Sequence, residues 1–160
     1  MIRFRPTSSG RIGRGVITIR GNHLLALPVR LHGIQLGRPV DLLLDREELR
    51  VLGLDVRCGD EVHRFLPLPT ASVSAEAIAI SSPLVLLEED QLDFYRTRAF
   101  AFTSLRGRPV EQRGREVGAL DDIVVRSDGS LHELVVTGNG ETLLAFDATV
   151  RVVAGSRSAA

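Results

Sequence analysis

The sequence predicts an all-β protein made of two small antiparallel β-barrels or meanders in tandem, joined by a short linker helix. The second half shows this most clearly, because short apolar runs alternate with tight turns at Asp128-Gly129 and Gly138-Asn139-Gly140. Turns of this kind are typical of β-hairpins, since glycine reaches positive φ at no steric cost. The predicted strands of this meander are Val117–Arg126, Leu131–Thr137, Glu141–Asp147 and Ala148–Val153.

A repeat with a period near 80 residues is the second observation behind this fold class. Placing Leu36-Gly37 over Val117-Gly118 brings Asp41 over Asp122 and three aliphatic residues over three more. A shorter sequence similarity, between residues 37–40 and residues 107–110, has a different offset, so both alignments cannot hold. We follow the longer match, which predicts an internal duplication.

The first half shows a similar alternation of short apolar runs and turns. Its predicted strands are Arg14–Arg20, His23–Leu31 after a turn at Gly21-Asn22, Val40–Leu44, Leu49–Val56 and Val62–Leu68. A charge order of early acids and late arginines predicts the linker helix around Glu88–Tyr95. The predicted organisation is a basic flexible arm (1–13), a first repeat (14–87), a linker (88–98), a second repeat (99–154) and a disordered tail (155–160).

Composition excludes several classes of protein. Cys58 is the only cysteine, so neither an intramolecular disulfide nor a cysteine-rich zinc site can form. No apolar run approaches the roughly 20 residues of a membrane-spanning helix, and the N-terminus has no signal-peptide pattern, which makes a cytoplasmic location the default expectation. All 20 basic residues are arginine, and the formal net charge is zero. A strongly basic nucleic-acid-binding domain is therefore not indicated.

One stretch of the second half resembles a known family. Gly107-Arg108-Pro109-Val110, the turn Gly114-Arg115-Glu116-Val117-Gly118, and Asp122 before an aliphatic strand are similar to motifs of the PRC-barrel family. The resemblance covers roughly Ala99–Val153, and more weakly Val29–Leu87. It implies a small β-barrel that docks other proteins, with no catalytic residues. The positions that it implies to be structural are Gly107, Pro109, Gly114, Gly118, Asp122 and Gly129.

No pattern in the sequence predicts catalysis, a cofactor or a metal site. The histidines, at positions 23, 32, 63 and 132, lack the spacing of a metal-binding motif. Cys58 falls in a predicted turn beside Arg57, without a general base indicated next to it. The glycine-rich start precedes a strand rather than a helix, so it does not fit a phosphate-binding loop.

The leading functional hypothesis is a non-enzymatic protein-binding or adaptor module. Because barrels of this size are marginal alone, the two copies should pack together or the chain should dimerise. The alternative hypothesis is an RNA-processing or ribosome-assembly factor resembling RimM, a member of the same superfamily. That hypothesis rests on the family resemblance. A separate feature is a predicted anion-binding arm, rich in arginine and free of acids, whose candidate partners are RNA phosphates, a membrane surface or an acidic protein face. The residues of this arm are Arg3, Arg5, Arg11, Arg14 and Arg20.

Overall fold

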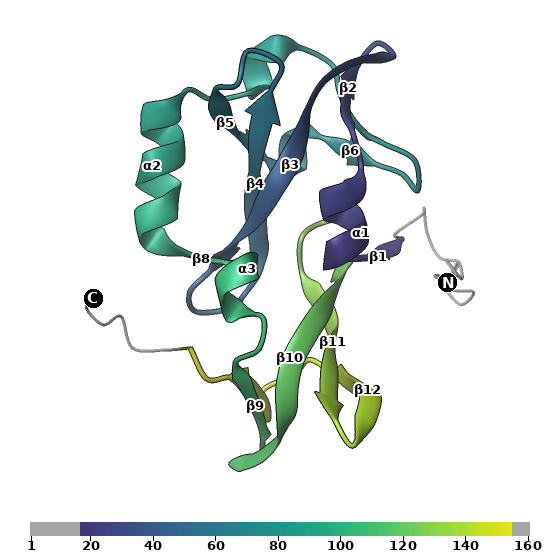
Figure 1. The fold of residues 1–160 in the computed structure, drawn as a ribbon, viewed down its shortest axis with the longest axis vertical. Coiled ribbons are helices and arrows are strands. Elements are labelled where there is room, and N and C mark those ends of the chain that lie inside the picture. Colours follow the sequence, from purple (N-terminus) through teal and green to yellow (C-terminus); the bar gives the residue numbers. More distant parts are fainter. Residues whose placement is uncertain (1–16, 155–160) are drawn as a thin grey trace.

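The computed structural model describes residues 17–154, which form two β-sheets and few helices (Figure 1). The first half contains β1 (Thr18–Arg20), α1 (Gly21–Ala26), β2 (Val29–Leu31), β3 (Ile34–Asp45), β4 (Val51–Cys58), β5 (His63–Pro67), η2 (Leu68–Thr70), β6 (Ser72–Val73), β7 (Ile78–Ile80) and η3 (Pro83–Val85). The second contains α2 (Glu89–Arg98), β8 (Ala99–Ala101), α3 (Phe102–Leu105), β9 (Pro109–Gln112), β10 (Arg115–Arg126), β11 (Leu131–Gly138), β12 (Gly140–Ala145) and β13 (Val150–Val152). The predicted all-β class and the linker helix are confirmed.

Both sheets are open. One has the strand order β12-β11-β10-β9-β13, with β1 on β10, and the other has β5-β4-β3-β2-β7-β6, with β8 on β3. Among the described strands no pairing joins the two ends of either path, so the predicted closure into barrels is not found. Pairing is antiparallel except between β2 and β7. Within residues 17–154 no helix has both the length and the apolar character to cross a membrane.

Five consecutive strands of the first half, β1 to β5, are matched in order by β8 to β12 of the second. β3 and β10 are both twelve residues long and lie 81 positions apart in the chain. Each is irregular at the same place, just before Asp41 in β3 and just before Asp122 in β10. Gly37 pairs with Val29 as Gly118 pairs with Val110. The longer sequence alignment is therefore the structural one.

The shorter sequence similarity, between residues 37–40 and 107–110, is coincidental. In the structure, Pro109-Val110 matches Pro28-Val29, because each pair begins the strand beside the long strand of its repeat. Sequence reasoning missed this counterpart.

The repeats exchange their leading segments. β1, at the start of the first repeat, pairs with β10 of the second, with Ile19 opposite Val125. β8, at the start of the second repeat, pairs with β3 of the first, with Phe100 opposite Leu44. The largest cluster of buried apolar side chains accordingly draws on both repeats. The expectation that the copies pack around a shared core is met within one chain.

The predicted turn at Gly21-Asn22 and the predicted strand His23–Leu31 are wrong. Residues 21–26 form α1, and only Val29–Leu31 is a strand. Leu24 on this helix is 1% exposed, and α1 packs against β3 and β10. Burial of one helical face between the two repeats outweighs the local preference of a Gly-Asn pair for turns.

The matched glycines Gly37 and Gly118 mark close approaches between strands. A Cβ atom at Gly118 would lie 2.5 Å from the carbonyl oxygen of Thr137, and one at Gly37 would lie 2.5 Å from that of Arg57. Gly118 also has a φ of 149°, which other residues rarely adopt. The long strands can cross their neighbours this tightly only where no side chain intervenes.

Candidate functional site

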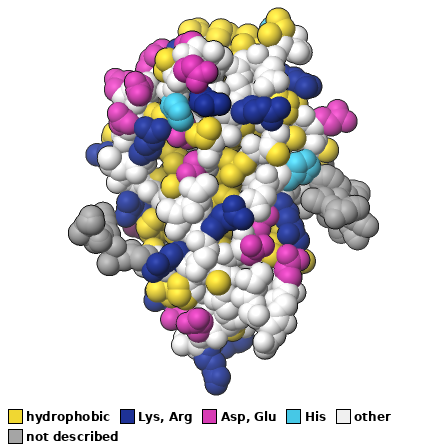
Figure 2. All heavy atoms as spheres, in the orientation of Figure 1, with side chains coloured by type: hydrophobic (Ala, Val, Ile, Leu, Met, Phe, Trp, Pro, Cys, Tyr) yellow, Lys and Arg dark blue, Asp and Glu magenta, His cyan; other side chains and the backbone are white. Residues whose placement is uncertain are grey.

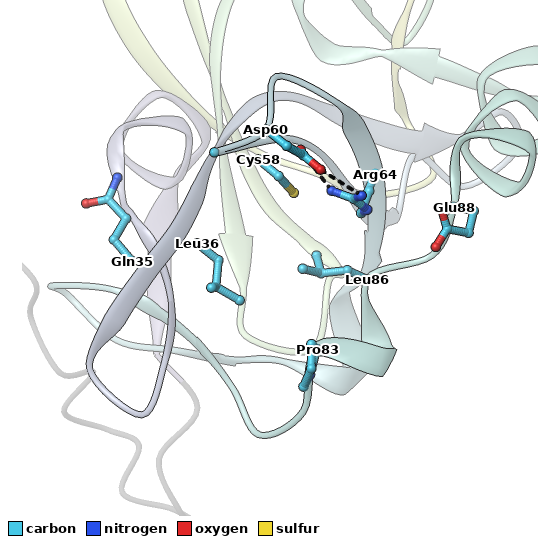
Figure 3. A pocket seen from close by; sticks show the side chains of 9 residues that line it. Gln35, Leu36, Cys58, Asp60, Arg64, Pro83, Leu86 and Glu88 are labelled. Carbon is cyan, nitrogen blue, oxygen red and sulfur yellow. Dashed lines mark hydrogen bonds and ion pairs between the residues drawn. The ribbon is translucent and has the colours of Figure 1, made fainter.

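An open groove of about 510 Å³ lies at one end of the first repeat (Figure 3). Three strands supply one side of it, and the segment between η3 and α2 supplies the other. The lining residues are Gln35, Leu36, Cys58, Gly59, Asp60, Arg64, Pro83, Leu86 and Glu88. Leu36, Leu86 and Pro83 make much of the lining apolar, whereas the polar side chains lie around them.

The two charged groups at the β4–β5 turn neutralise each other. Arg64 donates from Nη1 to Asp60 Oδ1 at 3.1 Å and from Nη2 to Asp60 Oδ2 at 3.0 Å. Hydrogen bonds from Arg64 and from the backbone of Val62 lower the pKa of Asp60. The hydrogen bonds that Arg64 donates to Asp60 in turn raise the pKa of Arg64. Both groups stay charged at neutral pH and their charges cancel, so Glu88 is the charged lining residue that stands outside this pair.

Cys58 is the last residue of β4, not part of a turn as the sequence suggested. Its side chain is buried, with Sγ 4.0 Å from the carbonyl oxygen of Val56. Alternation along the strands places the neighbouring His63 on the opposite face, where its Nδ1 lies 2.8 Å from Asp55 Oδ1. The thiol therefore lacks the adjacent base that a cysteine nucleophile requires.

The groove is flanked by the two most exposed large apolar side chains in residues 17–154. Leu84, which follows Pro83, is 85% exposed, and Ile34, on the same face of β3 as Leu36, is 67% exposed. Figure 2 shows hydrophobic side chains gathered at this end of the molecule. We call the groove together with Ile34 and Leu84 the groove surface. Contiguous exposed apolar side chains of this kind mark interaction sites on soluble proteins.

A buried polar network fixes α2 at the side of the groove. Asp55 is 5% exposed and accepts a hydrogen bond from Arg96 Nη2 at 2.8 Å in addition to its contact with His63. Beside it, the ring of Tyr95 stacks on that of Phe65 with centroids 4.1 Å apart. Sequence reasoning missed this network, because its members lie on three different elements and no spacing connects them.

Asp122 and its counterpart Asp41 each hold the first turn of the other repeat's helix. Asp122 Oδ1 accepts from the backbone N–H of Asn22 at 3.1 Å, and Asp41 Oδ1 accepts from that of Thr103 at 3.1 Å. Asp122, one of the positions that the resemblance implies to be structural, thus contacts α1. Burial raises the pKa of Asp122, against the opposing effect of its hydrogen bonds from Ile123 and Asn22. The role of this pair is structural.

The remaining family-type positions lie in turns and at strand starts around the second repeat. Gly107 follows α3, Pro109 begins β9, Gly114 is in the β9–β10 turn, and Gly129 is in the β10–β11 turn. Gly129 also joins the repeats, because its carbonyl oxygen accepts from the backbone N–H of Val51 at 2.8 Å. None of these residues lines the groove.

Four arginines of the predicted anion-binding arm, Arg3, Arg5, Arg11 and Arg14, lie outside the described residues. Arg20 lies on β1, with Nη1 3.7 Å from Glu141 Oε2. The four histidines do not converge, and in the described part of the chain no group of three His, Cys, Asp or Glu side chains could hold a metal ion.

Comparison with models of protein families and with curated proteins finds no match to this chain.

Proposed function

We propose that this chain is a non-enzymatic protein-binding module of the PRC-barrel type, which holds a partner protein on the groove surface. The observation that carries this proposal is the exposure of Leu84 beside a largely apolar groove in which Asp60 and Arg64 pair with each other. An exposed aliphatic side chain gains from being covered, and an open, largely apolar groove suits an apolar segment of a partner better than a small charged substrate.

The partner is expected to present an apolar segment with basic residues at its edge. Glu88 and Asp90 border the hollow beside Leu84, and Glu89 begins α2 next to them. Acids around an apolar centre favour arginine or lysine at the rim of the partner and increase the rate of association.

Replacing Leu84 with aspartate tests this proposal. A charge in place of this exposed apolar side chain should cost about 2 kcal/mol of binding free energy, as for a moderate hot spot. This corresponds to a roughly thirtyfold weaker complex. Val117→Asp is the matched control, because Val117 is also an exposed aliphatic residue but lies on β10 in the second repeat.

The measurement is quantitative capture of proteins from native cells by the wild-type chain and both variants, followed by titration of the enriched protein. A partner retained by Val117→Asp and lost with Leu84→Asp supports the proposal. Capture that is unchanged by Leu84→Asp, or that disappears after nuclease treatment, contradicts it. The nuclease-sensitive outcome would instead favour the RNA-processing hypothesis, which stays a prediction.

A further inference from the structure

A cleft of about 470 Å³ lies between the two repeats. One wall of it is the turn between β3 and β4, and the other is β13 with the two residues that follow. β13 belongs to the yellow end of the described chain in Figure 1 and pairs with β9. No residue of β9 lines the cleft, so the cleft lies along the side of β13 that faces away from β9. It shares no lining residue with the groove surface.

β13 presents unpaired backbone groups to this cleft. The N–H of Arg113 donates to the carbonyl oxygen of Thr149 at 2.8 Å, and the N–H of Val153 donates to that of Pro109 at 2.8 Å. Because hydrogen-bonded and non-hydrogen-bonded pairs alternate along an antiparallel ladder, the N–H and C=O of Val152 point away from β9. Within residues 17–154 neither group has a hydrogen-bond partner. Such a strand edge is a template for another strand.

In the first repeat, the matching edge is occupied. The strand orders β5-β4-β3-β2-β7-β6 and β12-β11-β10-β9-β13 match position by position as far as β7 and β13. The first sheet then continues with β6, which runs antiparallel to β7 with Ser72 opposite Ala79. Among the described strands, the second sheet ends at β13. The free edge of β13 is therefore the place that β6 takes in the first repeat.

The turns of the two repeats differ in the same way. Gly129 and Leu49 occupy matching places in the β10–β11 and β3–β4 turns, and both have positive φ, 95° and 57°. Gly129 packs on the other repeat, because its carbonyl oxygen accepts from Val51 N–H at 2.8 Å and its Cβ position lies 3.2 Å from Leu68 Cδ2. Phe146 follows β12 as Leu68 follows β5, and it lines the cleft together with Leu49. The space that is closed at Gly129 is thus open at Leu49.

The inner side of the cleft is apolar. Val150 and Val152 lie on the same face of β13 and pack on the main buried cluster, as do the half-buried rings of Phe100 and Phe146. Residues directly opposite each other on antiparallel strands have their side chains on the same face. A strand residue opposite Val152 would therefore place its side chain over this apolar surface.

The outer side of the cleft carries a small excess of positive charge. Arg151 points to the other face of β13, where its side chain is 68% exposed and its Nε lies 3.4 Å from Glu111 Oε1. Across the cleft, the guanidinium of Arg46 lies 4.8 Å from the centre of the Phe100 ring. Arg46 and Arg151 against Glu47 leave the lining with one net positive charge. Acidic residues are the complementary neighbours.

We propose that this cleft binds an extended segment of a partner protein, which adds to β13 as an antiparallel edge strand. Apolar residues of the segment lie opposite Val152, and acidic residues lie opposite Arg151. In this mode of recognition, backbone hydrogen bonds supply affinity and alternating side chains supply specificity. Because the cleft is separate from the groove surface, the inference does not depend on the proposed function.

Backbone methylation of a synthetic peptide tests strand addition directly. The probe is acetyl-Val-Glu-Val-Glu-Val-Glu-amide, titrated into the ¹⁵N-labelled full-length chain and followed by NMR. A valine opposite Val152 exchanges two backbone hydrogen bonds with it, whereas the N–H groups of the glutamates point away from β13. N-methylation of the three valines should therefore weaken binding at least about fivefold. The matched control, N-methylation of the three glutamates, should leave the affinity nearly unchanged.

The amide signal of Val152 should shift most on binding, and a peptide with arginine in place of glutamate should bind about threefold more weakly. Any other ranking of the two methylated peptides would overturn the inference, as would absence of binding at millimolar peptide. Shifts centred on Leu84 would assign the peptide to the groove surface instead. A Val152 signal that changes with protein concentration in the absence of peptide would assign the edge to a second copy of this chain.

Discussion

The contact between Gly21 and Phe102 is the most direct test of the shared core. Both residues begin the short helix that follows the leading strand of their repeat, so they occupy matching positions, and they meet between the repeats. A Cβ atom at Gly21 would lie 2.9 Å from Ile123 Cγ1 and 3.2 Å from Phe102 Cζ. Two phenylalanines could not share this place, and the glycine leaves room for the single ring.

Gly21→Ala should therefore destabilise the whole chain. Overpacking a tight site costs about 1–3 kcal/mol, and the better helix propensity of alanine returns at most about 1 kcal/mol. The expected net loss in the free energy of unfolding is about 1–2 kcal/mol. Shortening the ring with Phe102→Leu should relieve one of these close contacts, so the double variant should lose less than the sum of the single losses.

Guanidinium unfolding followed by far-UV circular dichroism and by the fluorescence of Tyr95 measures these values. Because the core is shared, both probes should report one coincident transition. Gly59→Ala is the control, since its Cβ would meet no atom closer than 4.0 Å, and its effect should stay within about 0.5 kcal/mol. Strictly additive losses at positions 21 and 102, or two separate transitions, would refute the reasoning.

Four further variants test individual contacts. Burial raises the pKa of Asp122. The contribution of this carboxyl group to stability is therefore full at acid pH and is lost as the pH rises through the raised pKa. In thermal melts, Asp122→Asn should thus gain stability relative to wild type between pH 4 and pH 8. Asp122→Ala, which leaves the N–H of Asn22 without its acceptor, should cost about 1–3 kcal/mol. Asp55→Ala should lower the free energy of unfolding by about 3 kcal/mol, because it removes the partner of two basic groups. It should also speed hydrogen exchange in α2 more than in β10. Uniform acceleration would show that the network does not hold the helix. Gly118→Ala should lower the unfolding free energy by more than about 1 kcal/mol, because its Cβ would meet the Thr137 carbonyl; an unchanged denaturation midpoint would contradict the observed close approach.

The sequence predicts the repeat because several residues at matching positions have local structural roles that other residue types cannot fill. Gly37 and Gly118 sit where a Cβ cannot fit, and Asp41 and Asp122 accept backbone hydrogen bonds that alanine cannot. Such residues recur at a constant interval even where the aliphatic residues between them vary. The interval of 81 positions can therefore be read from the sequence alone, as can the hairpins around Gly129.

The exchange of leading segments could not be read in this way. Residues 18–20 are compatible with pairing to either long strand, and the choice of β10 depends on how the two repeats pack. The Gly-Asn pair at the start of α1 favours a turn locally, and only contacts with Asp122 and Phe102 make it helical. The groove could not be predicted from the sequence either, because its lining comes from segments about fifty residues apart whose proximity follows from the fold.

The duplication explains why the groove surface exists in only one repeat. The counterparts of Cys58 and Arg64 are Gly138 and Thr142, identified by their pairing partners, and the segment around η3 has no counterpart before β13. The second repeat thus lacks both the paired charges and the opposite wall. Since the exchanged strands make each sheet depend on the other repeat, the second copy is required for stability whatever its surface carries. Its surface is therefore free to diverge, and under the proposed function the first copy can specialise in binding without losing its share of the core.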